Sequence, residues 1–217
     1  MSLTRFSSAA LVGLLAIFLI SILAMPGFAA PLASRTIDSG WEFHATSKTD
    51  LAEAQQWHPA QVPGVVQTDL LQNKLIPDPF YGNNETRLQW IGLTDWEYRT
   101  TFQVDDATLA HQHVEMVFDG LDTLAEVFVN DRSVLRSDNM FRRWRVEVKP
   151  ALHSGPNTLR IAFQSPITSL IPKVKALPYI LPSVSTHNYG NEENIATAPY
   201  TRKAAYNYGW DWGPRFV

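Results

Sequence analysis

Apolar and polar residues alternate with a period of two along much of the chain from Trp41 onward, and this pattern constrains the fold more than any other feature. Successive side chains of a β-strand point to opposite faces, so the alternation predicts strands with one buried and one solvated face. The predicted strands are 41–44, 96–104, 114–118, 125–129, 144–148 and 158–163. Many short strands of this kind favour an all-β fold, built as an antiparallel β-sandwich.

Turn-forming residues separate the predicted strands at 119–120, 130–131 and 154–157. Helix signals are few. Residues 50–56, with Thr49 as a candidate cap, and residues 65–72 each predict a short helix. From Ile167 to Asn194 the alternation is lost and prolines recur, so we expect a long ordered loop in this carboxy-terminal part of the chain.

The first thirty residues differ from the rest of the chain. Arg5 precedes an almost wholly apolar stretch, residues 9–24, and the small residues Gly27 and Ala29 follow it. This order is typical of a secretory signal peptide, which we place at residues 1–29. Cleavage after Ala30 is less favourable, because Pro31 would then follow the cut bond. An uncleaved membrane anchor is the alternative, but the apolar stretch is short for a span that needs about 20 residues.

Export would place the mature chain, residues 30–217, in the periplasm or outside the cell, with no stable membrane insertion once the signal is removed. The sequence contains no cysteine, so disulfides cannot stabilise it. Its hydrophobic core must therefore be large enough to hold the fold without them.

Composition excludes several classes of function. The formal charge is −3 and basic residues never form a long run, so a nucleic-acid partner is not expected. No histidine pair has the helical i, i+4 spacing of a metalloprotease; His111 and His113 would lie together on a strand edge, but a third ligand is missing. No cofactor is expected either, and the chain has no glycine-rich phosphate loop. It also lacks the Gly-x-Ser-x-Gly elbow that would present a nucleophilic serine.

Two Asn-Glu pairs, Asn84-Glu85 and Asn191-Glu192, have the form in which glycosidases often carry an acid/base glutamate at the end of a barrel strand. Neither pair follows a predicted buried strand. We therefore expect both glutamates to be solvated loop residues rather than catalytic ones.

The most informative segment runs from Arg202 to Pro214 and contains Trp210, Asp211 and Trp212. Indole rings offer flat faces that match the C–H faces of a sugar, and a carboxylate between them can accept two hydroxyl hydrogen bonds. Gly213-Pro214 would turn the chain immediately afterwards. The alternative is an aromatic strand that fills the core, in which the two tryptophans share one face and Asp211 lies in a turn.

This segment also carries a resemblance. Arg202-Lys203 followed by Trp210-Asp211-Trp212-Gly213-Pro214 resembles the segment that closes the first domain of β-mannosidases, which belong to the glycoside hydrolase family that also holds β-galactosidases and β-glucuronidases. The loop Ile76-Pro77-Asp78-Pro79-Phe80-Tyr81-Gly82-Asn83-Asn84-Glu85 is similar to a loop of β-mannosidases in particular. Further similar stretches, in the same order along the chain, are 40–43, 62–64, 68–70, 95–99, 118–123, 129–130 and 137–141.

The resemblance implies a jelly-roll-like, galactose-binding-like sandwich as the first domain of a larger enzyme. Immunoglobulin-like domains and a (β/α)8 barrel would follow, and the barrel would supply an acid/base and a nucleophilic glutamate that act with retention. No catalytic residue is then expected in this segment. We expect the domain at 30–217 to be truncated at its carboxy end and to be inactive alone.

The resemblance also implies roles for four residues of this chain. Trp210 and Asp211 would reach into the pocket of the barrel and line the subsite for the terminal mannose. Trp212 would complete that motif, and Arg202 would orient Asp211. The expected substrates are β-mannoside oligosaccharides, and the expected protein partner is the remainder of the same enzyme.

Two other functions remain open at this point. The parent enzyme could be a relative that cuts another glycan, such as an endo-β-mannosidase or an exo-β-glucosaminidase. The sandwich could instead be a free-standing carbohydrate-binding module.

The leader generates a first prediction. The exported protein should begin at Ala30, because Gly27 and Ala29 form the pair of small residues that precedes the cut. Intact-mass spectrometry of the exported product measures this directly. An exported protein that still carries Met1 would show that the leader is a membrane anchor.

Overall fold

The computed structural model describes residues 33–47, 49–179, 181, 187–189 and 192–209. Met1–Thr36 and Ile37–Val217 are separate compact units, and every element below lies in the second. Its strands are β1 (Glu42–Ala45), β2 (His58–Pro59), β3 (Trp96–Val104), β4 (Glu115–Phe118), β5 (Leu124–Val129), β6 (Arg132–Ser137), β7 (Trp144–Glu147), β8 (Gly155–Gln164), β9 (His187–Tyr189) and β10 (Glu192–Ile195). Its α-helices are α2 (Val66–Gln72), α3 (Asn84–Arg87), α4 (Asp106–Ala110) and α5 (Ile171–Lys175). Short 3-10 helices are η1 (Ala52–Gln55), η2 (Gln89–Leu93), η3 (Lys149–Ala151), η4 (Ala198–Tyr200) and η5 (Ala205–Tyr208).

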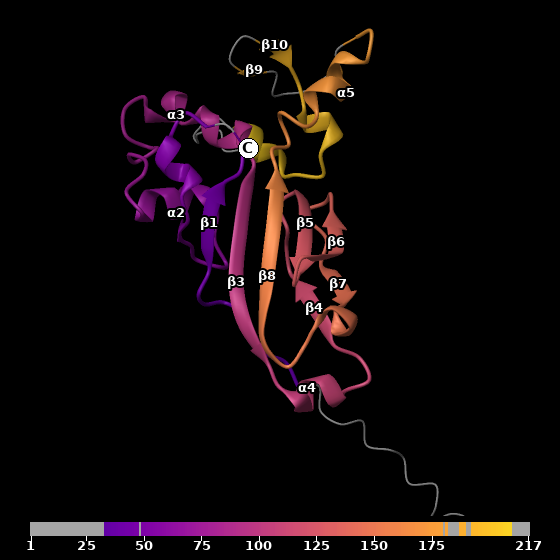
Figure 1. Cartoon of the computed structure of the whole chain (residues 1–217). Coiled ribbons are helices and arrows are strands. Elements are labelled where there is room, and N and C mark those ends of the chain that lie inside the picture. Colours follow the sequence, from indigo (N-terminus) through magenta and orange to yellow (C-terminus); the bar gives the residue numbers. More distant parts are fainter. Residues whose placement is uncertain (1–32, 48, 180, 182–186, 190–191, 210–217) are drawn as a thin grey trace, which may run out of the picture. The chain divides into compact units, whose positions relative to one another are not determined.

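Six strands form the main sheet, in the order β2-β1-β3-β8-β5-β6, and all neighbours are antiparallel (Figure 1). The two longest strands lie at its centre and pair without interruption from Trp96↔Phe163 to Val104↔Gly155. Along β3 every second side chain is buried, from Trp96 to Val104. The alternation predicted for 96–104 is therefore confirmed, and it gives the sheet one apolar face.

A second, two-stranded sheet covers part of that apolar face. β4 and β7 pair antiparallel, with Met116 opposite Val146 and Phe118 opposite Trp144. These four side chains pack on the main core, whereas the residues between them are exposed. Two layers of antiparallel strands around one core confirm the all-β sandwich.

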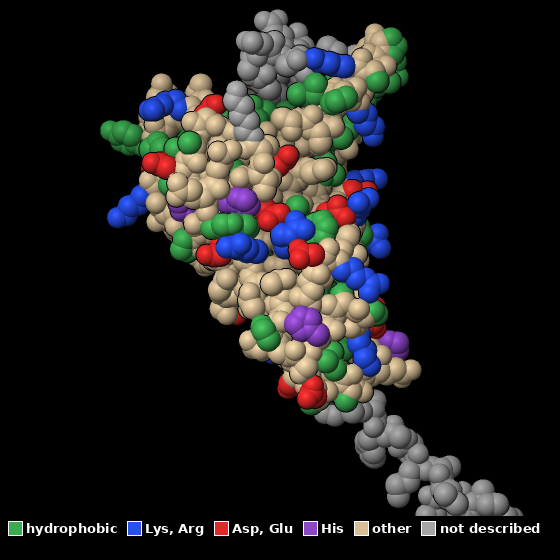
Figure 2. All heavy atoms as spheres, in the orientation of Figure 1, with side chains coloured by type: hydrophobic (Ala, Val, Ile, Leu, Met, Phe, Trp, Pro, Cys, Tyr) green, Lys and Arg blue, Asp and Glu red, His purple; other side chains and the backbone are tan. Residues whose placement is uncertain are grey.

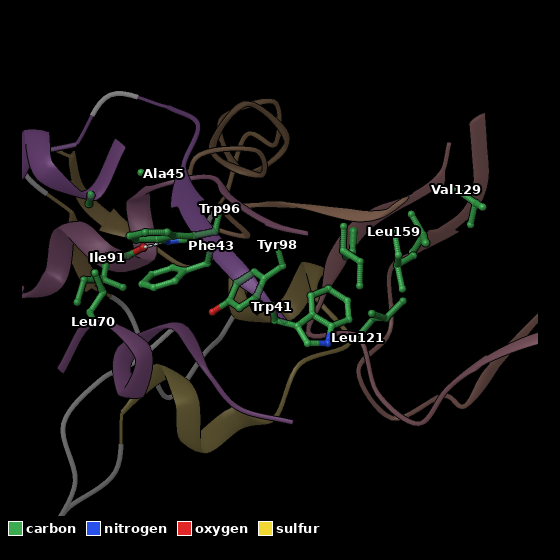
Figure 3. Packing of buried hydrophobic residues seen from close by; sticks show 14 of the residues in the cluster. Trp41, Phe43, Ala45, Leu70, Ile91, Trp96, Tyr98, Leu121, Val129 and Leu159 are labelled. Atoms are coloured by element: carbon green, nitrogen blue, oxygen red, sulfur yellow. Dashed lines mark hydrogen bonds between the residues drawn. The ribbon is translucent and has the colours of Figure 1, made fainter. Parts of the chain in front are cut away.

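Helices and loops close the core beside β1 and β3 (Figure 3). Phe43 lies between the rings of Trp96 and Tyr98, at centroid distances of 5.9 and 5.6 Å. Leu70 of α2 and Ile91 of η2 are buried against this group, and the carbonyl of Ile91 accepts a hydrogen bond of 3.1 Å from the Trp96 indole. Short helices therefore cover this part of the core, which further strands would cover in a sandwich made of strands alone.

The outer face of the main sheet carries side chains of both charges. Its ion pairs cross between neighbouring strands: Glu42–Arg99 at 2.9 Å, Glu97–Arg160 at 2.8 Å and Glu126–Arg136 at 3.0 Å. Blue and red side chains also lie side by side in a band across the face shown in Figure 2. Exposed pairs of this kind add little stability, but they keep the face polar.

The turns are partly as predicted. Asn130 and Asp131 have φ angles of 49° and 63° and join β5 to β6, as expected of a two-residue hairpin. The strand after this turn, β6, was not predicted, because its residues Arg132–Ser137 do not alternate cleanly. The predicted turn at 154–157 is too long, since β8 already begins at Gly155.

The predicted short helices at 50–56 and 65–72 correspond to η1 and α2. The predicted cap at Thr49 is wrong: the N-cap of η1 is Leu51, and Thr49 Oγ1 accepts from the Leu51 N–H at 3.3 Å ahead of the helix. The prediction of a long loop from Ile167 to Asn194 is wrong. This segment contains α5 and the antiparallel pair β9–β10. Pro172 is compatible with α5 because it stands in the first turn, where a backbone N–H would have no acceptor within the helix.

One carboxylate lies wholly inside the fold. Asp69 of α2 has no exposed surface; its Oδ2 accepts a hydrogen bond of 2.8 Å from the Tyr98 hydroxyl, and its Oδ1 accepts one of 2.9 Å from the Gln61 N–H. Burial raises the pKa of Asp69, although both hydrogen bonds oppose the rise. Burial and the neighbouring Asp69 also raise the pKa of Tyr98, so Tyr98 remains a donor. Asp69 thus links α2 to the central strand.

Asp69→Ala should lower the free energy of unfolding by about 2–4 kcal/mol, because it leaves the buried Tyr98 hydroxyl without an acceptor. Asp69→Asn should lose less. The folded-state pKa of Asp69 is raised, so its contribution to stability is complete below the unfolded value of 3.8 and falls as pH rises above it. The Asn variant should therefore gain on the wild type as pH increases.

Urea denaturation at several pH values between 4 and 7 measures both effects. Asp131→Asn, the same change at an exposed turn position, is the matched control and should stay within about 0.5 kcal/mol of the wild type. If Asp69→Ala behaved like this control, the proposed link between α2 and β3 would be wrong.

Candidate functional site

The structure describes one of the four predicted sugar-binding residues, Arg202. Trp210, Asp211 and Trp212 lie outside the described residues. The chain that leads to them is described, and we call residues Ala196–Gly209 the anchor segment. Its contacts with the rest of the domain fix the chain as far as Gly209, the residue before Trp210.

The anchor segment contains η4 and η5 and contributes several side chains to the interior. Ala196, Thr197, Ala204 and Tyr208 are all buried. The ring of Tyr200 also packs with Ile167 and Val174 of the preceding segment, in a small second hydrophobic cluster. The segment therefore packs on the domain as an ordered part of it.

Backbone contacts tie the anchor segment to the loop after β6. Asn139 and Arg202 form a parallel bridge, in which the Met140 N–H donates to the Arg202 carbonyl at 3.0 Å. The Ala204 N–H then donates to the Met140 sulfur at 2.9 Å. The side chain of Arg202 is exposed. Its predicted role, to orient Asp211, stays a prediction.

An ion pair ties the anchor segment to the loop after β4. Lys203 Nζ lies 2.6 Å from Asp122 Oδ2, and the two side chains are 7% and 37% exposed. The Thr123 hydroxyl also hydrogen-bonds Asp122, at its other oxygen. A lysine this buried needs its counter-charge, because an unpaired ammonium loses hydration without compensation.

The last described helix of the segment ends in a second internal contact. The Tyr208 hydroxyl lies 2.7 Å from the Thr201 hydroxyl, and the Tyr208 ring is 1% exposed. Burial raises the pKa of Tyr208, and the negative charge of Asp122 adds to the rise. Tyr208 therefore stays protonated at neutral pH.

Gly209 then redirects the chain. Its φ and ψ angles are 125° and 146°, a conformation that is essentially restricted to glycine. Any other residue here would strain the backbone immediately before Trp210. Gly209 therefore sets the backbone direction at the end of the described anchor segment.

The remaining candidates from the sequence lie elsewhere. Asn84 and Glu85 begin the helix α3, and Glu192 begins the strand β10, so the prediction that both glutamates lie in loops is wrong. His111 and His113 are not on a strand, because β4 begins at Glu115. His113 instead lies 2.9 Å from Glu147. Within the described residues, no group of three or more His, Asp or Glu side chains could hold a metal ion.

Comparison with known proteins identifies the domain. Residues 41–217 match the family described as glycosyl hydrolase 2 galactose-binding domain-like. The chain belongs to this family. The match confirms the galactose-binding-like sandwich and the resemblance inferred from the sequence.

Curated relatives of this glycosyl hydrolase 2 domain include β-mannosidases by name. Beta-mannosidase B of Thermothelomyces thermophilus is 38% identical over 189 residues, which cover 87% of this chain and 21% of the relative. Beta-mannosidase B of Aspergillus clavatus is 36% identical over 187 residues, which cover 85% and 21%. The chain thus spans about a fifth of the length of the curated relatives it matches.

Solved structures agree. The crystal structure of a β-D-mannosidase from Dictyoglomus thermophilum matches with a TM-score of 0.69 and 38% identity, covering 82% of this chain and 20% of that one. An exo-chitosanase from Amycolatopsis orientalis matches with a TM-score of 0.51 and 23% identity, covering 61% and 17%. This second likeness supports the fold alone.

Sequence reasoning missed three residues that hold the anchor segment in this family member: Asp122, Lys203 and Tyr208. Asp122 and Lys203 both stand in motifs that carried the resemblance, but their pairing joins positions 81 residues apart. No local pattern predicts a contact over that separation.

Proposed function

We propose that this chain is the amino-terminal domain of an exo-acting β-mannosidase, an enzyme that removes terminal, non-reducing β-D-mannose with retention. The observation that carries the proposal is the 36–38% identity to β-mannosidases over 82–87% of the chain. The likeness to the exo-chitosanase is lower, at 23% identity, and does not favour a glucosaminidase.

In this proposal the domain binds sugar and does not break the bond. Trp210 and Trp212 would stack on the pyranose, Asp211 would accept hydrogen bonds from its hydroxyls, and Arg202 would orient Asp211. The anchor segment supports these roles, because its ion pair, buried tyrosine and glycine fix the chain up to the residue before Trp210. The two carboxylates that retention needs, about 5 Å apart, would come from the remainder of the enzyme.

We also propose that the protein is exported, to the periplasm or the medium, on the basis of residues 1–29. Among the residues that the structure describes, no helix has the length and apolar character needed to cross a bilayer. With a formal charge of −3, no nucleic-acid partner is expected.

The chain alone should not hydrolyse an aryl β-mannoside, because Glu85 lies in the first turn of a short helix and Glu192 begins a strand of a small antiparallel hairpin, so neither stands at the end of a parallel barrel strand. Release of the aryl group by the purified chain measures this. Turnover that disappeared in Glu85→Gln or Glu192→Gln would contradict the proposal.

Asp211→Ala in the full-length enzyme should lower kcat/KM by about 10- to 150-fold. A hydrogen bond to a charged group contributes about 1.5–3 kcal/mol, and each 1.4 kcal/mol is about tenfold in rate. Asp211→Asn should lose less, since its amide oxygen still accepts. The loss should also be smaller for substrates that lack the contacted hydroxyl.

The melting temperature must be measured beside these kinetics, because a turn residue would change stability and leave the rate per folded molecule unchanged. An Asp211→Ala enzyme that folds normally and stays within about twofold of the wild type would refute the assignment of Asp211 to the sugar site.

A further inference from the structure

The ion pair between Asp122 and Lys203 is unusual among the ion pairs described in this domain. It joins the loop after β4 to the anchor segment, and the Lys203 side chain is only 7% exposed. The arginines of the outer sheet face are 31–79% exposed in their ion pairs. An exposed pair is free to hydrate and change partner, whereas a buried lysine at 2.6 Å is confined to one position.

The place of this pair along the chain matters as much as its burial. Lys203 is followed by η5, whose buried Tyr208 is hydrogen-bonded back to Thr201. Gly209 then sets the direction of the next residue. From Lys203 to Gly209 the segment therefore has little freedom of its own, and movement of Lys203 would carry Gly209, the residue before Trp210, with it.

We propose that Asp122 and Lys203 are a positioning pair, which fixes the anchor segment, up to the residue before Trp210, relative to the sheet. Neither residue needs to touch the sugar. The consequence for sugar binding rests on the proposed function, but the consequence for the anchor segment does not.

Physical chemistry favours positioning over stabilisation as the role of this pair. The Lys203 ammonium is taken out of water while Asp122 remains 37% exposed, and the lost hydration of a buried charge opposes folding, so such an ion pair is often no more stable than an apolar pair of the same size. What an apolar pair lacks is a fixed distance and direction. The double change Asp122→Leu/Lys203→Met should therefore keep the fold but loosen the register of the anchor segment.

Indole spectra of the chain test this without any activity. The chain has seven tryptophans, and ¹⁵N labelling gives one indole signal for each, assigned by single Trp→Phe changes. In Lys203→Met and in the double variant, the signals of Trp210 and Trp212 should shift or broaden. Those of the buried Trp41 and Trp96 should stay in place. Lys203→Arg, which keeps the charge, should restore much of the wild-type spectrum.

Lys74→Met is the matched control, because Lys74 is exposed in the turn after α2; all seven signals should remain unchanged. Unchanged Trp210 and Trp212 signals in the double variant would overturn the proposal. If Trp41 and Trp96 also moved in Lys203→Met, the variant would be misfolded. In that case Asp122→Asn, which removes only the charge, replaces it as the test. Unchanged Trp210 and Trp212 signals in Asp122→Asn would overturn the proposal.

Kinetics of the full-length enzyme give the second measurement. If the pair positions the sugar site, the double variant should lose about 10- to 100-fold in kcat/KM at a nearly unchanged melting temperature, because small misplacements of binding groups have effects of this size. A wild-type enzyme without β-mannosidase activity would contradict the proposed function alone. An active double variant within twofold of the wild type, with shifted indole signals, would refute the link between position and sugar binding.

Discussion

The pairing of β3 with β8 is the interaction on which the rest of the domain depends. The two strands are far apart in sequence, yet they pair along the whole length of β3. Every other strand of the main sheet is added outward from them, β1 on β3 and β5 on β8. Their alternation sends Trp96 and Tyr98 to one face and the Glu97–Arg160 pair to the other. The apolar face that results must be covered, and this requirement determines the second layer.

That second layer is mixed. β4 and β7 cover one part of the core with the side chains of their inner face. α2, η2 and the loops between them cover the part around Phe43. A helix laid over a sheet leaves backbone and side-chain polar groups to be satisfied at its ends. Here Asp69 of α2 meets the Tyr98 hydroxyl and a backbone N–H, so the polar cost of covering the sheet with a helix is met by a hydrogen-bonded carboxylate.

The sequence predicts this architecture well where the signal is local. Alternation identified β3 over its observed length, and Asn130-Asp131 identified a hairpin turn, because both depend on neighbouring residues. Prediction failed where tertiary contacts decide. Pro172 suggested a loop but lies in the first turn of α5, and the polar residues around Glu192 suggested another loop but form β10. The motif at 210–212 was recognisable by its chemistry and resemblance, whereas the contacts that hold the anchor segment before it join distant positions.

Two aspartates show how the partner decides the role of a buried or half-buried carboxylate. Asp69 accepts hydrogen bonds from groups that carry no charge, and burial raises its pKa; such a site contributes to stability and responds to pH. Asp122 faces a lysine that has almost no access to water, so the lysine cannot leave Asp122 without leaving its own charge buried and unpaired. The first arrangement holds a helix on a sheet. The second restrains one segment at one distance, which is what a domain needs if residues at its end must meet a sugar held largely by other parts of an enzyme.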